Sequence, residues 1–158
     1  MTVQTVKAVI ANMEKLNQHL ETLEAFISAK KAKVIADDLV WLLDSLTEEQ
    51  WLVAEGNDIE AKRLQIFEEL GLSGKKAKQL IEESPEEFRA KLTLECTNAE
   101  KHIDRIKQLN IDITEIIERK LSIQEKAVKA PPSSMETYTG KGVKVRTHNT
   151  SGGFFGEV

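Results

Sequence analysis

The sequence predicts an all-α protein, an elongated antiparallel bundle of three long helices followed by a disordered C-terminal tail. Residues 1–128 are rich in Ala, Leu, Ile, Glu and Lys, and their apolar residues recur at intervals of three and four. Residues 129–158 hold two of the three prolines, five of the eight glycines and no Leu or Ile. We therefore expect a helical domain over 1–128 and a flexible tail over 129–158.

The first expected helix carries one narrow apolar stripe with the spacing of a heptad seam. Its members are Val6, Val9, Met13, Leu16, Leu20, Leu23 and Ile27. Because polar residues such as Lys7, Asn12 and Gln18 lie between these positions, packing of this helix against its own chain explains the pattern without an external partner. Residues 29–33 lack large apolar side chains, so we expect them to bend or to link two helices.

A second apolar series runs from Val34 to Leu52 and resumes at Ile59. Gly56 interrupts it weakly, since one glycine costs a helix about 1 kcal/mol relative to alanine, and a helix supported by packing can run through it. Gly71 followed by Leu72 predicts a helix end, because glycine readily adopts the left-handed conformation past the last turn.

The last third of the chain begins with helix-start signals. Ser73 is expected to cap a short helix that ends near Ile81, and residues 84–87, Ser-Pro-Glu-Glu, predict the start of the next helix. That helix should continue to about Val128, before the prolines at 131 and 132. At about 1.5 Å per residue it would span roughly 60 Å, which is why we expect an elongated bundle.

Composition excludes several classes of protein. The net charge of −4 is modest and no basic stripe runs along the chain, so we expect no nucleic-acid partner. Cys96 is the only cysteine, and a lone thiol cannot close an internal disulfide. We find neither a signal peptide at the N-terminus nor an apolar run of membrane-spanning length. We expect a cytoplasmic protein without stable membrane insertion.

No catalytic or metal-binding constellation is recognisable in the sequence. Cys96, His19, His102 and His148 are far apart, whereas zinc ligands come in close spacing. Residues 71–76, Gly-Leu-Ser-Gly-Lys-Lys, lack the spacing of a phosphate-binding loop. We predict that the protein is not an enzyme and has no cofactor, that Cys96 is an inert buried thiol, and that His102 is a satisfied interface residue.

The last helix has more apolar residues than one narrow stripe needs. They are Ile103, Ile106, Leu109, Ile113, Ile116, Ile117, Leu121 and Ile123. A thin bundle that leaves part of this width uncovered would offer a groove to a partner helix. The bundle itself, or a homodimer, could instead cover it completely. The pattern alone leaves both interpretations open.

Three segments give the chain a resemblance to the FlgN family. Residues 63–72, Arg-Leu-Gln-Ile-Phe-Glu-Glu-Leu-Gly-Leu, resemble the family's arginine, apolar pair and Leu-Gly-Leu stop. Residues 106–110, Ile-Lys-Gln-Leu-Asn, are similar to its last helix, although one Asn stands here where two are common. Residues 137–142, Thr-Tyr-Thr-Gly-Lys-Gly, resemble its tail, and they follow a Pro-Ser linker as the family's do.

The resemblance implies a function. FlgN proteins are chaperones that hold hook-associated proteins, those of the hook–filament junction of the bacterial flagellum, and deliver them to the type III export gate before they assemble. By this resemblance Tyr138 would contact the cytoplasmic domain of the export gate. Cargo would bind the apolar face of the last helix, at Leu109, Ile113, Ile116, Ile117 and Leu121.

Two other functions remain open from the residues. A structural or adaptor coiled-coil protein would self-associate through the seam over residues 6–27, and it would form a defined oligomer without any client. A chaperone of another secretion system, or of another flagellar part, would share the same physics and differ only in its cargo.

Overall fold

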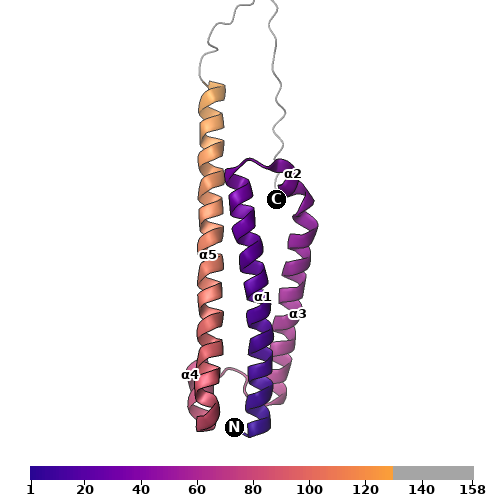
Figure 1. Ribbon diagram of the computed structural model, residues 1–158, viewed down its shortest axis with the longest axis vertical. Helices are drawn as coiled ribbons and strands as arrows, with labels where there is room; N and C mark the ends of the chain where they lie inside the picture. Colours follow the sequence, from indigo (N-terminus) through magenta and orange to yellow (C-terminus); the bar gives the residue numbers. More distant parts are fainter. Residues whose placement is uncertain (130–158) are drawn as a thin grey trace, which may run out of the picture. The chain divides into compact units, whose positions relative to one another are not determined.

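The computed structural model describes residues 1–129, which form five helices and no strand. They are α1 (Val3–Ile35), α2 (Leu39–Asp44), α3 (Leu46–Glu69), α4 (Ala77–Glu83) and α5 (Glu86–Lys129) (Figure 1). Residues 1–121 form one compact unit, and a second begins at Ser122, of which the end of α5 is described. The all-α class is confirmed, but two short helices accompany the three long ones. The predicted boundary after residue 128 stays a prediction.

The direction of each long helix follows from its ion pairs. From α1 to α5, the pairs Glu14–Lys91, Glu24–His102 and Lys31–Asp112 rise together in residue number, so these two helices run the same way. From α1 to α3 the order reverses, because His19 meets Glu55 and the later Lys30 meets the earlier Glu49. Only α3 is therefore antiparallel to the other two.

The bend expected at residues 29–33 is wrong, because α1 continues unbroken to Ile35. The lysines of this stretch are supported by neighbours, with Lys30 Nζ 2.6 Å from Glu49 and Lys31 Nζ 2.5 Å from Asp112. The chain leaves the helix after Ile35, and Asp37 takes the left-handed conformation with a φ of 54°. Asp38 N–H bonds to the Lys33 carbonyl and Asp37 N–H to that of Val34, a Schellman ending in which aspartate takes glycine's usual place.

The expectations for α3 are confirmed at both glycines. The helix runs through Gly56 and stops before Gly71, whose φ of 66° suits glycine. Leu72 N–H donates to the Phe67 carbonyl, and the Leu72 side chain is buried with Phe67. The cap expected at Ser73 is wrong, since α4 begins at Ala77. There Lys76 N–H donates to the side-chain oxygen of Gln79.

Ser84 joins α4 to α5 in a different way from the one expected. Ser84 is the C-terminal cap of α4, and its buried hydroxyl donates to the Leu80 carbonyl at 2.6 Å. The Arg89 guanidinium donates to the carbonyls of Ser84 and Glu82, and the N-terminal amine of Met1 donates to that of Glu83. These bonds satisfy carbonyls that a helix end leaves free.

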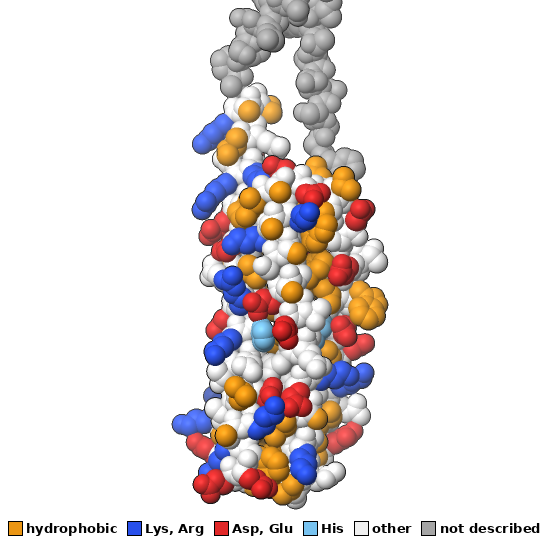
Figure 2. Space-filling model, in the orientation of Figure 1, with side chains coloured by type: hydrophobic (Ala, Val, Ile, Leu, Met, Phe, Trp, Pro, Cys, Tyr) orange, Lys and Arg blue, Asp and Glu red, His pale blue; other side chains and the backbone are white. Residues whose placement is uncertain are grey.

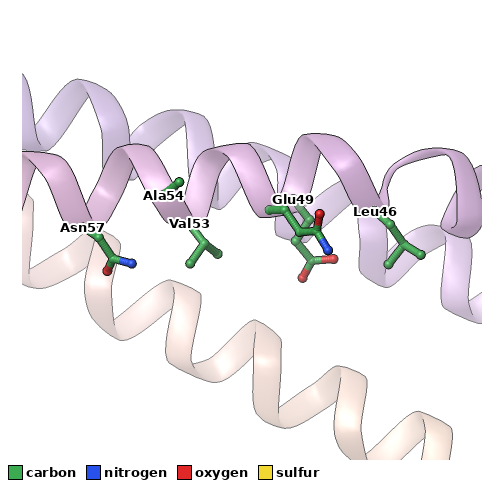
Figure 3. Close-up of a pocket in the computed structure, with 6 residues that line it drawn as sticks. Leu46, Glu49, Val53, Ala54 and Asn57 are labelled. Carbon is green, nitrogen blue, oxygen red and sulfur yellow. The ribbon is translucent and has the colours of Figure 1, made fainter. Parts of the chain in front are cut away.

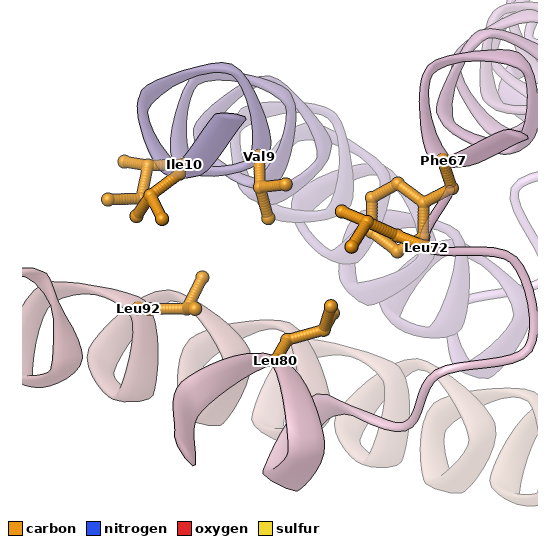
Figure 4. Close-up of a cluster of buried hydrophobic side chains, with 7 residues drawn as sticks. Val9, Ile10, Phe67, Leu72, Leu80 and Leu92 are labelled. Atoms are coloured by element: carbon orange, nitrogen blue, oxygen red, sulfur yellow. The ribbon is translucent and has the colours of Figure 1, made fainter. Parts of the chain in front are cut away.

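The core consists of two apolar clusters. The first, near the start of α1, contains Val6, Val9, Ile10, Phe67, Leu72, Leu80 and Leu92 (Figure 4). The second, near the end of α1, contains Phe26, Ile27, Val34, Leu52, Leu109 and Ile113. Much of the expected seam of α1 is thus buried against its own chain. Buried polar residues also occur, namely Asn12, Asn17, His19, Ser45, Ser84 and Glu95.

Candidate protein-binding surface on the last helix

The structure separates the five predicted cargo-binding residues into two groups. Leu109 and Ile113 lie in the second core cluster, with 2% and 6% of their surface exposed, and Ile116 packs against the edge of that cluster. Ile117 and Leu121 are 39% and 41% exposed. The two exposed residues are therefore available to a partner, whereas the two buried ones hold α5 in the bundle.

Helix geometry explains this division. At about 100° per residue, Ile113 and Ile116 return close to the direction of Leu109, while Ile117 and Leu121 lie roughly 80° and 120° around the helix. Ile103, 37% exposed, falls in the same direction as Leu121. We call Ile103, Ile117 and Leu121 the α5 flank.

The exposed positions near these apolar residues include two uncharged polar residues and one lysine. Asn110 and Thr114 lie at roughly 100° and 140° on the same scale, and both are exposed. Thr114 donates its hydroxyl proton to the Asn110 carbonyl at 3.0 Å. Lys107 is also exposed and lies at roughly 160°, so both neutral and charged side chains lie beside the apolar residues of the α5 flank.

A polar network fastens α5 to α1. Asn17 Nδ2 donates to the backbone carbonyl of Glu95 at 3.0 Å and to its carboxylate at 2.7 Å. Lys91 lies 2.7 Å from the Glu95 carboxylate and 2.8 Å from that of Glu14. Hydrogen bonding from Lys91, and then from Asn17, holds the pKa of Glu95 below its ordinary value.

Lys120 makes a second polar connection, at the end of α1. Its ammonium donates to the backbone carbonyls of Val34 and Ile35 and to the Asp37 carboxylate. The two carbonyls belong to the last turn of α1, where helix carbonyls lack their usual partners, and that of Val34 also accepts from Asp37 N–H. Lys120 therefore anchors α5 immediately beside Leu121 of the flank.

The other candidates from the sequence have structural roles. Burial raises the pKa of the Cys96 thiol, and the neighbouring Glu100 and Glu95 raise it further, so the thiol stays protonated and unreactive. His102 Nδ1 lies 2.6 Å from the Glu24 carboxylate, as expected of a satisfied interface residue. Tyr138 lies outside the described residues. Within residues 1–129, no three His, Cys, Asp or Glu side chains gather as a metal ion would require.

A shallow hollow of about 420 Å³ lies on α3, and sequence reasoning did not anticipate it. Leu46, Glu49, Val53 and Asn57 line it, and in the close-up they point to the side of α3 on which the α5 ribbon runs (Figure 3). Their spacing of three and four residues places them on one side of α3, where Leu46 and Val53 are apolar and Glu49 and Asn57 are polar.

The neighbouring α2 was also missed as a surface, although none of its six residues is buried. The signal was present in its sequence, Leu-Val-Trp-Leu-Leu-Asp, which has more apolar residues than one buried face of a short helix can hold.

A helical chain whose long helices display apolar residues to solvent has the features of a protein-binding protein. No helix in the described part of the chain combines the length and apolarity needed to cross a membrane. The chain matches the family described as FlgN protein over residues 1–145. It therefore belongs to the FlgN family, a family of flagellar export chaperones. Searches of curated proteins and of solved structures gave no significant match.

Proposed function

We propose that this chain is a cytoplasmic chaperone for hook-associated proteins, which it keeps from assembling early and delivers to the flagellar export gate. Membership of the FlgN family over residues 1–145 is the observation that carries the proposal. The exposed apolar flank of α5 supports it, because a chaperone that shields a sticky helix needs an apolar surface of its own.

In this proposal the cargo helix lies along α5. Ile117 and Leu121 contact it directly, and Ile116 does so from the edge of the second core cluster. Leu109 and Ile113 support cargo binding indirectly. They are buried against α1 and α3, and this packing fixes the position of α5, which carries the contact residues. Each Å² of apolar surface buried by binding contributes about 25 cal/mol of favourable free energy. The entropic costs of association reduce this gain.

The contact with the export gate is assigned to Tyr138, which lies beyond the described residues. An aromatic residue outside the cargo surface could reach a second protein while cargo stays bound. We expect Tyr138→Ala to weaken binding to the purified cytoplasmic domain of the export gate and to leave cargo affinity unchanged. An equal loss of cargo affinity would contradict this division of roles.

Self-association through the seam over residues 6–27 is less well supported. Val6, Val9, Leu20 and Ile27 are at most 8% exposed, so the chain already uses this seam internally. A self-associating protein would need to open its own core to offer it. We therefore favour the chaperone over a structural coiled coil.

Isothermal titration calorimetry with purified hook–filament junction proteins tests the proposal. We expect saturable binding that disappears when the terminal helical segments of the junction protein are removed. Purified flagellin and hook-cap protein serve as controls for the choice of cargo. Binding of a control but not of a junction protein would assign the chain to another cargo, and a stable oligomer without affinity for any of them would favour the structural alternative.

A further inference from the structure

Several aliphatic side chains of α2 are exposed to solvent. Leu39, Val40 and Leu43 are 61%, 71% and 62% exposed, and helix geometry places them on one side of α2, opposite Trp41 and Leu42, which pack against the second core cluster. Side chains of this size are usually buried when nothing binds them, and contiguous exposed ones mark interaction surfaces.

This apolar surface lies in a segment with one sign of charge. Residues 34–61 contain no Lys or Arg, and their acidic residues are Asp37, Asp38, Asp44, Glu48, Glu49, Glu55, Asp58 and Glu60. In the space-filling view, orange and red side chains accordingly alternate in the region of α2 and the adjoining part of α3 (Figure 2).

Only some of these acids are neutralised by lysines from other helices. Lys33 pairs with Asp38 at 2.8 Å, and Lys120 pairs with Asp37. Asp44 and Glu48, by contrast, are exposed and form no ion pair within residues 1–129. Asp44 shares the exposed side of α2 with Leu43, and Glu48 follows four residues later. We call Leu39, Val40, Leu43, Asp44 and Glu48 the α2 patch.

The charge of the α2 patch selects among the partners that an apolar surface could bind. Anionic lipid and nucleic acid carry the same sign as Asp44 and Glu48 and are repelled. A second copy joined through the same patch on a two-fold axis would bring the acids of one copy against those of the other. A helix with aliphatic residues along one face and lysine or arginine beside them matches both features.

We propose that the α2 patch is a docking site for a basic amphipathic helix of another protein. The site is separate from the α5 flank and does not depend on the proposed cargo. Leu39, Val40 and Leu43 bury the partner's aliphatic face, while Asp44 and Glu48 pair with its flanking cations. The charged pairs steer association and set specificity, and the aliphatic contacts supply most of the affinity.

Two designed helical peptides test the site on the full chain. Both carry the same leucine face, and one has lysines beside it where the other has glutamates. Calorimetry should detect the lysine peptide and not the glutamate peptide, with affinity that falls as salt rises. Leu43→Glu should weaken binding roughly tenfold or more, equivalent to about 1.4 kcal/mol. Because α2 has no buried residue, this variant should keep its fold, which circular dichroism checks.

Two further variants make the test specific. Leu94→Glu places the same charge on an apolar residue of α5 that is 53% exposed, and it should not change affinity for the lysine peptide. The double variant Asp44→Lys with Glu48→Lys should reverse the preference and bind the glutamate peptide. Equal binding of both peptides, equal loss in Leu94→Glu, or a dimer that Leu43→Glu dissociates would each overturn the proposal.

Discussion

His19 and Gly56 show how closely α1 approaches α3. The imidazole of His19 is 7% exposed, and its Nδ1 lies 3.3 Å from the Glu55 carboxylate. A Cβ placed on Gly56 would lie only 2.8 Å from Nε2 of the same ring. Glycine weakens α3 at this position by about 1 kcal/mol relative to alanine, and the close contact with His19 explains its presence.

We expect Gly56→Ala to lower the free energy of unfolding by about 1 kcal/mol, because the buried ring of His19 must move and the strain outweighs the gain in helix propensity. In a His19→Ala background the space is free, and the same change should instead raise stability by about 1 kcal/mol. Urea denaturation of the four proteins in this cycle measures both values. A change of the same sign in both backgrounds would rule out the contact as the cause.

Two buried asparagines of α1 should respond in opposite ways to leucine. Asn12 is 8% exposed and its side-chain oxygen has no hydrogen-bond partner, so Asn12→Leu should stabilise the protein by about 1 kcal/mol. The side-chain oxygen of Asn17 also lacks a partner, but its Nδ2 donates two bonds to Glu95, and Asn17→Leu should therefore destabilise the protein by about 2 kcal/mol. Thermal unfolding distinguishes the two, and stabilisation by both variants would show that the bonds to Glu95 contribute nothing.

At the scale of elements, the interface between α1 and α5 makes stability depend on pH. The pKa of Glu95 lies below its ordinary value of 4.5, chiefly because Lys91 and then Asn17 bond to the carboxylate. The folded state thus binds this proton less readily than the unfolded state. The contribution of Glu95 is fully present above the ordinary value and is lost as pH falls through the lowered one.

We therefore expect the unfolding free energy to decrease as pH drops below 4.5, and to decrease less steeply in Glu95→Gln. Other carboxyls with lowered pKa values, such as Asp112 beside Lys31, keep part of the slope in the variant. Urea midpoints across this pH range give the comparison. Parallel curves for the two proteins would mean that Glu95 does not couple folding to protons.

Helix ends show which features of an element a sequence reveals. The stop at Gly71 was predicted because glycine is the usual residue in the left-handed position, and the structure has it there. The stop at Asp37 uses the same backbone geometry without glycine, so it left no signal and the break was placed instead at residues 29–33. The lysines there are held by Glu49 and Asp112, partners distant in sequence that no local pattern reveals.

At the scale of the whole molecule, the spacing of apolar residues on α5 predicted a wide face but not which part of it the bundle covers. Leu109 and Ile117 belong to the same predicted face, yet one is 2% and the other 39% exposed. The difference depends on where α1 and α3 lie around α5, which follows from contacts such as Asn17 with Glu95. The α2 patch differs, because its sequence carries a signal, namely more apolar residues than one buried face of a short helix can hold.

Binding of hook-associated proteins to the α5 flank, as proposed, requires two kinds of residue on one helix. Some hold the bundle together, and others contact cargo. Leu109→Ala should cost about 2–5 kcal/mol of stability, because it leaves a cavity in the second core cluster. Truncation of the exposed Leu121 should change the free energy of unfolding little. It should instead lower the affinity for cargo.

The most direct measurement compares the cargo affinity of three full-length proteins by calorimetry with one purified hook–filament junction protein. These are the unmodified chain, the double variant Ile117→Glu with Leu121→Glu, and the control Leu94→Glu, whose side chain is also exposed on α5. The account predicts that the double variant keeps its thermal midpoint but binds at least about 100-fold more weakly, equivalent to roughly 2.8 kcal/mol, while the control binds normally. Unchanged affinity in the folded double variant would contradict the claim.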